Sequence, residues 1–194
     1  MSETQTQQET LLDYLQTIRD AVLWKLDGAS EYDVRRPLTP TGSNLLGLVK
    51  HLAYVELGYF VTSFGRPMPV PDLFADPDAD PHDDLCVRVD ESRDDIIGLY
   101  RLAWEESART FADHDLDSIA VVPWWDPSRN RVTLGKLLVH VIAETNRHAG
   151  QMDILRETVD GATGLRADNS NLPDDDYDWA AYLERVEAAA RTFR

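Results

Sequence analysis

One segment of the chain carries three polar residues whose spacing suggests chemistry. In LLVHVIAETNRHAGQMD, the residues His140, Glu144 and His148 recur every four positions, so a helix places them along one face. Apolar residues alternate with them, which predicts that this face of the helix packs against the core and is shielded from water. An ionised carboxylate is costly to bury unless Arg, Lys or a metal lies beside it. Neither Lys nor Arg falls in this stripe, so the pattern favours a divalent cation.

A third imidazole comes from another predicted helix. His51 falls on the apolar stripe of residues 45–59. Alone it is better explained as a core histidine that bonds a carbonyl group, but with Glu144 and His148 it gives three protein ligands and an open position. Because His140 and Glu144 have the same spacing, they are an alternative pair. His140 could instead orient a ligand or touch substrate.

Other site chemistries lack their residues. Cys86 is the only cysteine, which excludes an intramolecular disulfide, a CxxC redox pair and a Cys-rich zinc site. The Glu-x-x-His motif of two-metal carboxylate bundles is absent, as are HExxH, GxGxxG and GxxxxGK. A metal would therefore have His and carboxylate ligands. Zinc is favoured by that set, and nickel or iron would accept it.

Five helices are predicted to position these residues. Apolar residues recur at intervals of three and four in the segments 11–26, 43–65, 91–113, 133–161 and 177–193. Ser43 and Thr133 are the expected N-caps of the second and fourth, and Gly65 and Gly161 their expected ends. Residues 116–131 could form either a short extended pair or an irregular loop.

The remaining long segment, residues 66–90, predicts an irregular connection. Its alternating prolines and aspartates cannot hold a regular element, and the aspartates are expected to be solvated. The fold class that we predict is all-α: an antiparallel up-and-down four-helix bundle with a long crossover loop and an extra C-terminal helix packed outside. We expect one domain over residues 1–194.

Composition limits the partners. The 19 Lys and Arg against 35 Asp and Glu give a formal net charge of −16, which disfavours nucleic acid and anionic membrane surfaces. No apolar run approaches the roughly 20 residues needed to span a bilayer, and MSETQTQQET does not resemble a targeting peptide. We expect a cytoplasmic protein. A homodimer is one oligomeric state that we consider.

Two segments resemble a known family. Residues 23–56 read LWKLDGASEYDVRRPLTPTGSNLLGLVKHLAYVE, and residues 132–161 read VTLGKLLVHVIAETNRHAGQMDILRETVDG. Together they resemble the DinB-like helical-bundle proteins of actinobacteria, in a branch long called a domain of unknown function. The resemblance implies one metal bound by His51, Glu144 and His148. Many members have His where Glu144 stands, and the Glu version is similar to mycothiol-dependent maleylpyruvate isomerase and its relatives.

This similarity implies metal-assisted thiol chemistry and leaves the acceptor open. We expect an enzyme that brings a small-molecule thiol such as mycothiol to an electrophilic substrate, in an S-transferase, thiol-addition or isomerisation step. The alternatives are a metal-dependent hydrolase and a non-catalytic metal-binding bundle. An open coordination position argues against a purely structural metal. His140 is the candidate catalytic residue for moving the released proton.

The open position should face a cavity between the second and fourth helices. Tyr100 or Trp104, together with Trp124, are the expected wall residues. Trp124 and Trp125 precede the fourth helix, so they either cap this pocket or pin a loop to the bundle. Gln151, one turn beyond His148, either supports a ligand or only packs.

Overall fold

The computed structural model describes residues 5–73, 78–173 and 176–194. The chain divides into two compact units, Met1–Ala162 and Thr163–Arg194. The described ranges hold six α-helices, one short 3-10 helix and a two-stranded sheet, so the chain is mostly helical, as predicted. No helix in these ranges is both long and apolar enough to cross a membrane. The single domain expected over residues 1–194 stays a prediction.

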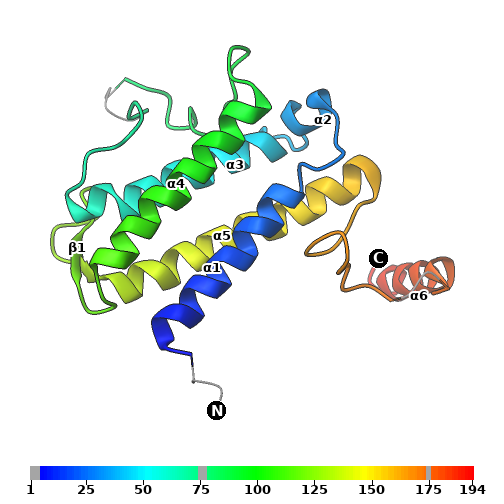
Figure 1. Cartoon of the computed structure of the whole chain (residues 1–194). Coiled ribbons are helices and arrows are strands. Elements are labelled where there is room, and N and C mark those ends of the chain that lie inside the picture. The colour runs from blue at the N-terminus through cyan, green and yellow to red at the C-terminus, as the bar shows by residue number, and fades with distance from the viewer. Residues whose placement is uncertain (1–4, 74–77, 174–175) are drawn as a thin grey trace. The chain divides into compact units, whose positions relative to one another are not determined.

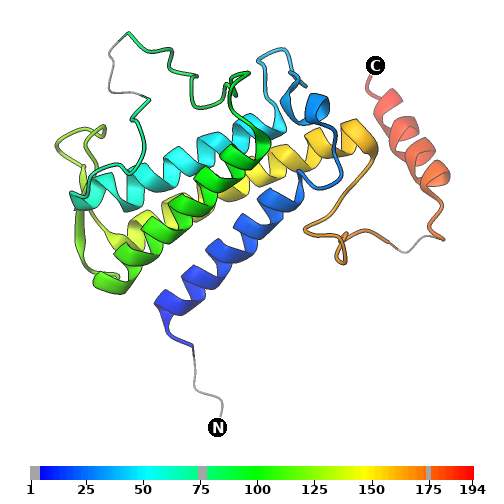
Figure 2. The ribbon, with the colours of Figure 1, turned by 45° about the horizontal axis from the view of Figure 1, so that its top comes forward.

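Four long helices dominate the first unit. They are α1 (Gln7–Trp24), α3 (Leu45–Phe60), α4 (Arg93–Asp113) and α5 (Leu134–Asp160), with the short α2 (Glu31–Arg35) between the first two. Helix α3 packs against α4 and α5, and α1 packs against α5 (Figures 1 and 2). Their apolar stripes meet in a core that includes Leu15, Phe60, Leu134, Leu137 and Leu138. The periodicity of the sequence therefore predicted all four helices.

Local capping explains the helix ends. The Thr133 side chain caps α5, and Gly161 ends it in a left-handed conformation with φ of 77°, both as predicted. The predicted cap of α3 is wrong by one residue. Asn44 accepts the hydrogen bond from the Gly47 amide at 2.7 Å, whereas the Ser43 hydroxyl accepts one from Gln151 of α5 at 2.8 Å. Ser43 thus links the two site helices.

The undecided segment before α5 contains a short antiparallel pair. Strands β1 (Ile119–Val121) and β2 (Arg131–Thr133) pair with Ala120 opposite Val132. Both central residues are buried, while their neighbours along β1 are exposed. Since β2 runs directly into α5, this pair fixes the connection that carries Trp124 and Trp125.

The segment 66–90 is irregular in its described parts, 66–73 and 78–90, as predicted. Asp76 and Pro77 of that segment lie outside the described residues. Its end is fastened to α3, because the buried Lys50 ammonium donates to the Cys86 carbonyl at 2.7 Å. A methyl group at Gly47 would lie only 2.1 Å from the Leu85 carbonyl oxygen, so glycine permits this close approach.

The second unit contains α6 (Trp179–Arg191), close to the predicted span 177–193. Asp178 caps the helix by accepting a hydrogen bond from the Ala181 amide at 2.9 Å. Two further aspartates of the preceding acidic segment, Asp174 and Asp175, lie outside the described residues.

A buried ion pair joins three helices of the first unit. Arg19 of α1 donates to the fully buried Glu56 of α3 through Nε at 2.9 Å, and Ser107 of α4 donates to the same carboxylate at 3.3 Å. Burial raises the pKa of Glu56, and the Arg19 guanidinium opposes that rise. The carboxylate therefore depends on Arg19 for its charge.

We predict that Arg19→Met lowers the free energy of unfolding by about 3–5 kcal/mol, because it strands a buried charge. The double variant Arg19→Met/Glu56→Met should recover much of the loss, since it removes both charges. Denaturant unfolding of the single and double variants measures the coupling. Arg88→Met is the control, because it removes one partner of the exposed ion pair between Arg88 and Asp90. It should change the free energy of unfolding little.

Candidate metal centre

The structure brings the three predicted ligands together at the contact between α3 and α5. His51 comes from α3, and Glu144 and His148 come from α5; one ligand atom from each lies within 4.8 Å of the others. Glu144 Oε1 is 3.0 Å from His148 Nε2 and 3.8 Å from His51 Nε2. The imidazole rings meet edge to face with centroids 4.8 Å apart. Three ligand atoms therefore converge on one point.

Hydrogen bonds on the far side of each imidazole aim it at that point. His51 Nδ1 bonds Asp84 Oδ2 at 2.6 Å, and His148 Nδ1 bonds Gln151 Oε1 at 3.1 Å. Because each outer partner is an oxygen acceptor, a proton on Nδ1 satisfies that contact and leaves the Nε2 lone pair for a cation at the cluster. Two neutral imidazoles and one carboxylate are a donor set that suits one divalent cation.

Gln151 bonds His148, which fits the supporting role considered for it. Its amide nitrogen donates to the Ser43 hydroxyl at 2.8 Å, which leaves the amide oxygen to accept from His148. The side chain thus bridges α5 to the residue before the α3 cap, and one hydrogen-bond chain orients His148 and ties the two helices.

Asp84 was missed, and its assignment to the solvated aspartates is wrong. Only 6% of the residue is exposed, because Lys50 and the Asn44 amide hold the neighbouring carbonyls of Cys86 and Leu85 against α3. Irregular segments carry no period that would distinguish one aspartate from another. The apolar Leu85 immediately after it was the available signal that this end of the segment meets the core.

A cavity of about 750 Å³ opens beside the cluster. Trp124 lines it, as predicted, but Tyr100 and Trp104 do not. They lie on the other side of α3, where the fully buried Tyr100 packs on Trp104 and Arg19 stacks over the Trp104 ring. The spacing of apolar residues in α4 shows which of its residues face the core. It does not show which neighbouring helix or cavity those residues contact. The expected wall residues were therefore only partly correct.

The polar face of α5 borders this cavity, so the expectation that it is dry is wrong. About a third of the Glu144 side chain is exposed. Its charge is therefore partly solvated, and it does not need a metal merely to offset burial. The convergence of Glu144 with His51 and His148 is the feature that favours a cation here.

His140 also lines the cavity, one helical turn from Glu144. Its Nε2 shares a hydrogen bond of 3.0 Å with the Tyr59 hydroxyl, and its ring packs between those of Tyr59 and Trp125. The sequence placed Tyr59 on an apolar stripe and gave no sign of this polar contact. Tyr59 and His140 form a second polar pair in the same cavity.

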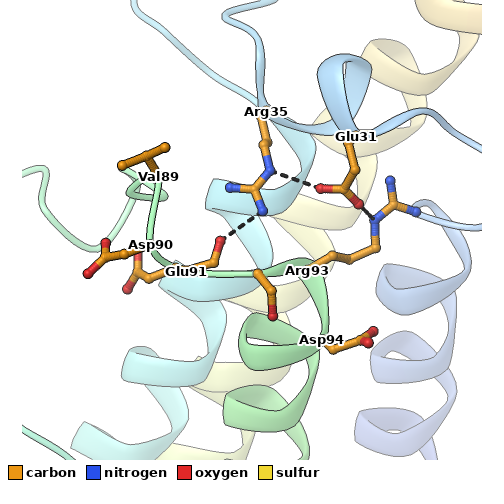
Figure 3. A pocket seen from close by; sticks show the side chains of 8 residues that line it. Glu31, Arg35, Val89, Asp90, Glu91, Arg93 and Asp94 are labelled. Atoms are coloured by element: carbon orange, nitrogen blue, oxygen red, sulfur yellow. Dashed lines mark hydrogen bonds and ion pairs between the residues drawn. The ribbon is translucent and has the colours of Figure 1, made fainter.

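A separate surface hollow near the start of α4 has a different character (Figure 3). Arg35 donates to the Glu31 carboxylate at 3.0 Å and to the Glu91 carbonyl at 2.8 Å, and Arg93 pairs with Glu31 at 2.6 Å. These groups engage one another and fasten α2 to the end of segment 66–90. The hollow is explained by this structural role.

Comparison with protein families decides the relationship. The family model of Mycothiol-S-transferase matches residues 10–161. The chain belongs to the mycothiol S-transferase family. This match is consistent with the DinB-like resemblance, and the mycothiol S-transferase span includes His51, His140, Glu144 and His148. No curated protein matches the chain.

The ligand set predicts stoichiometric metal binding by this mycothiol S-transferase family member. We expect one Co²⁺ or Zn²⁺ per chain, measured by titration of protein prepared without a histidine tag. His51→Ala and His148→Ala should each abolish tight binding, because two ligands rarely suffice. His82→Ala changes an exposed histidine and should leave the stoichiometry at one. Retained tight binding in both ligand variants would show that the cation sits elsewhere.

Asp84 provides a second test, directed at orientation. Removing a carboxylate that holds a ligating histidine typically costs about 10- to 100-fold in metal affinity. We expect a loss of this size for Asp84→Ala in a competitive chelator titration. Asp83→Ala changes the exposed neighbour and is the matched control. Equal affinity in the two variants would contradict the positioning role of Asp84.

Proposed function

We propose that this protein is a metal-dependent enzyme that transfers a low-molecular-weight thiol, mycothiol by the family's name, to an electrophilic small molecule. The observation that carries the proposal is the convergence of His51, Glu144 and His148 at the edge of an open cavity. Family membership supports the thiol substrate. The single cysteine of the chain is consistent with a reducing, cytoplasmic location.

In this proposal the three residues hold one divalent cation, zinc being favoured by the donor set and nickel or iron being acceptable. When bound, the cation supplies positive charge that lowers the pKa of an adjacent thiol from about 8.5, so that the thiolate is available at neutral pH. Glu144 adds negative charge to the ligand set, and Asp84 holds His51 in place. We also propose that α1, α3, α4 and α5 form the antiparallel up-and-down bundle of DinB-like proteins.

His140 and Tyr59 are proposed to move the proton. Before the sulfur bonds carbon and the leaving group departs with its electron pair, the thiol proton must be removed. Tyr59 lines the cavity, and its hydroxyl shares a hydrogen bond of 3.0 Å with His140 Nε2. A proton can therefore pass from the thiol to the Tyr59 oxygen while the Tyr59 proton passes to His140. His140 returns it to solvent or to the leaving group.

The same donor set would also suit a hydrolase, in which water replaces the thiol as nucleophile. His140 would then serve as base through the same contact. No structural feature favours water over sulfur, whereas the family match favours sulfur. A non-catalytic metal site would not need the cavity that borders Glu144. Thiol transfer is therefore the preferred function.

The test is conjugation of mycothiol to 1-chloro-2,4-dinitrobenzene by the metal-loaded protein, followed as thioether formation and chloride release. We expect a rate above the uncatalysed reaction that disappears on chelation and returns on adding metal. His51→Ala and His148→Ala should remove it, and His82→Ala should not. Thiol-independent release of chloride would support the hydrolase instead.

His140→Gln separates proton transfer from metal binding. Glutamine can still bond the Tyr59 hydroxyl but cannot take up the proton. We expect the turnover number to fall about 100-fold or more while the metal stoichiometry stays at one. An unchanged turnover number would mean that His140 only packs against Tyr59 and Trp125.

A further inference from the structure

The cavity beside the metal centre has an aromatic wall. Trp124 lies against α3 at Gly58, where an added methyl group would come within 2.9 Å of the indole Cη2, so a larger residue would displace the ring. Trp124 is 52% exposed, and its ring meets that of Tyr59 edge to face at 5.2 Å. Met68 and Val55 add apolar surface. An exposed indole with apolar neighbours is a surface on which a flat apolar ligand gains free energy.

The charges around the same cavity are negative. Asp72, Asp84 and Glu144 line it, and no described lining residue is Arg or Lys. Residues 74–77, which lie outside the described ranges, contain no Arg or Lys in sequence. Two of these carboxylates are enough to offset the charge of a divalent cation, so a thiolate leaves the loaded site net negative. A carboxylate-bearing substrate would need a guanidinium or ammonium partner that the described cavity does not offer.

We infer that the acceptor of the thiol is an uncharged electrophile with an aromatic or apolar body, which stacks on Trp124, and that carboxylate-bearing acceptors are rejected. The inference rests on the proposed function and names its second substrate class. The step remains a displacement: the thiol proton passes to Tyr59 as the Tyr59 proton passes to His140, the sulfur–carbon bond forms, the carbon–halide bond of the probe breaks, and halide leaves with the electron pair. It favours transfer over isomerisation of a carboxylate-bearing substrate.

The test uses two acceptors that differ in charge and share a reactive carbon. Methyl 4-(chloromethyl)benzoate is neutral, and 4-(chloromethyl)benzoate is an anion. With mycothiol and metal-loaded protein, kcat/KM corrected for the uncatalysed rate should be at least about tenfold higher for the ester, since like charges are juxtaposed with the acid. Equal values for both would overturn the inference while leaving thiol transfer established.

A lysine added to the wall should reverse this preference. Met68 is half-buried and lines the cavity, so Met68→Lys can lay its stem along the same surface and bring an ammonium to the acceptor. The ratio of kcat/KM for the ester to kcat/KM for the acid should fall at least threefold, mainly because the value for the acid rises. Val89→Lys makes the same charge change at a fully exposed position outside the cavity and should leave the ratio as in the unaltered protein. Equal shifts in both variants would indicate long-range steering and overturn the local assignment.

Binding of an unreactive pair makes the inference testable without turnover. Methyl 4-methylbenzoate should bind and perturb the Trp124 indole signal in NMR spectra, while 4-methylbenzoate should bind at least about tenfold more weakly. If neither chloride is conjugated, the proposed function fails, and this pair still decides whether the cavity selects neutral aromatics. Equal binding of both would overturn the inference, as would binding that leaves the Trp124 signal unmoved.

Discussion

The structure depends on helix α3 being buried on nearly all sides while carrying charged and ionisable residues. Each of these residues is matched by a different neighbour. Glu56 pairs with Arg19 of α1, Lys50 holds the Cys86 carbonyl, and His51 meets the polar face of α5. Because a buried polar group without a partner is costly, each contact fixes the position of one neighbour. The cluster of His51, Glu144 and His148 is thus one of three sets of polar contacts that helix α3 makes with its neighbours.

Residues whose environment is set by their own helix were predictable from the sequence. The spacing of His140, Glu144 and His148 is a local property of α5, and the apolar periods of the long helices are local too. Predicting the role of His51 required one long-range assumption, namely that residues from two different helices bind the same metal ion. The family resemblance and the residue chemistry pointed to the same residues. The spacing alone could not separate His140 from His148 as the partner of Glu144.

Residues whose environment depends on the path of an irregular segment were not predictable. Asp84 reaches His51 only because two contacts hold the residues after it against α3. Lys50 binds the Cys86 carbonyl, and Gly47 leaves room for the Leu85 carbonyl. Neither fact appears in the composition of an acidic segment. The placement of Tyr100 failed for a related reason, since the inward side of α4 meets Glu56 and not the cavity. A period gives the buried face of a helix and does not identify the neighbour.

The candidate site divides its tasks between regular and irregular structure. Its candidate ligands lie on α3 and α5, where packing and the bonds to Asp84 and Gln151 orient the two imidazoles. Part of the cavity wall comes from connections, with Met68 in one and Trp124 in another, and part from Val55 and Tyr59 of α3. Substitutions in connections are tolerated more readily than substitutions at a helix crossing. In the proposed enzyme, acceptor choice can therefore change through Met68 and Trp124 while the metal ligands on the helices stay the same.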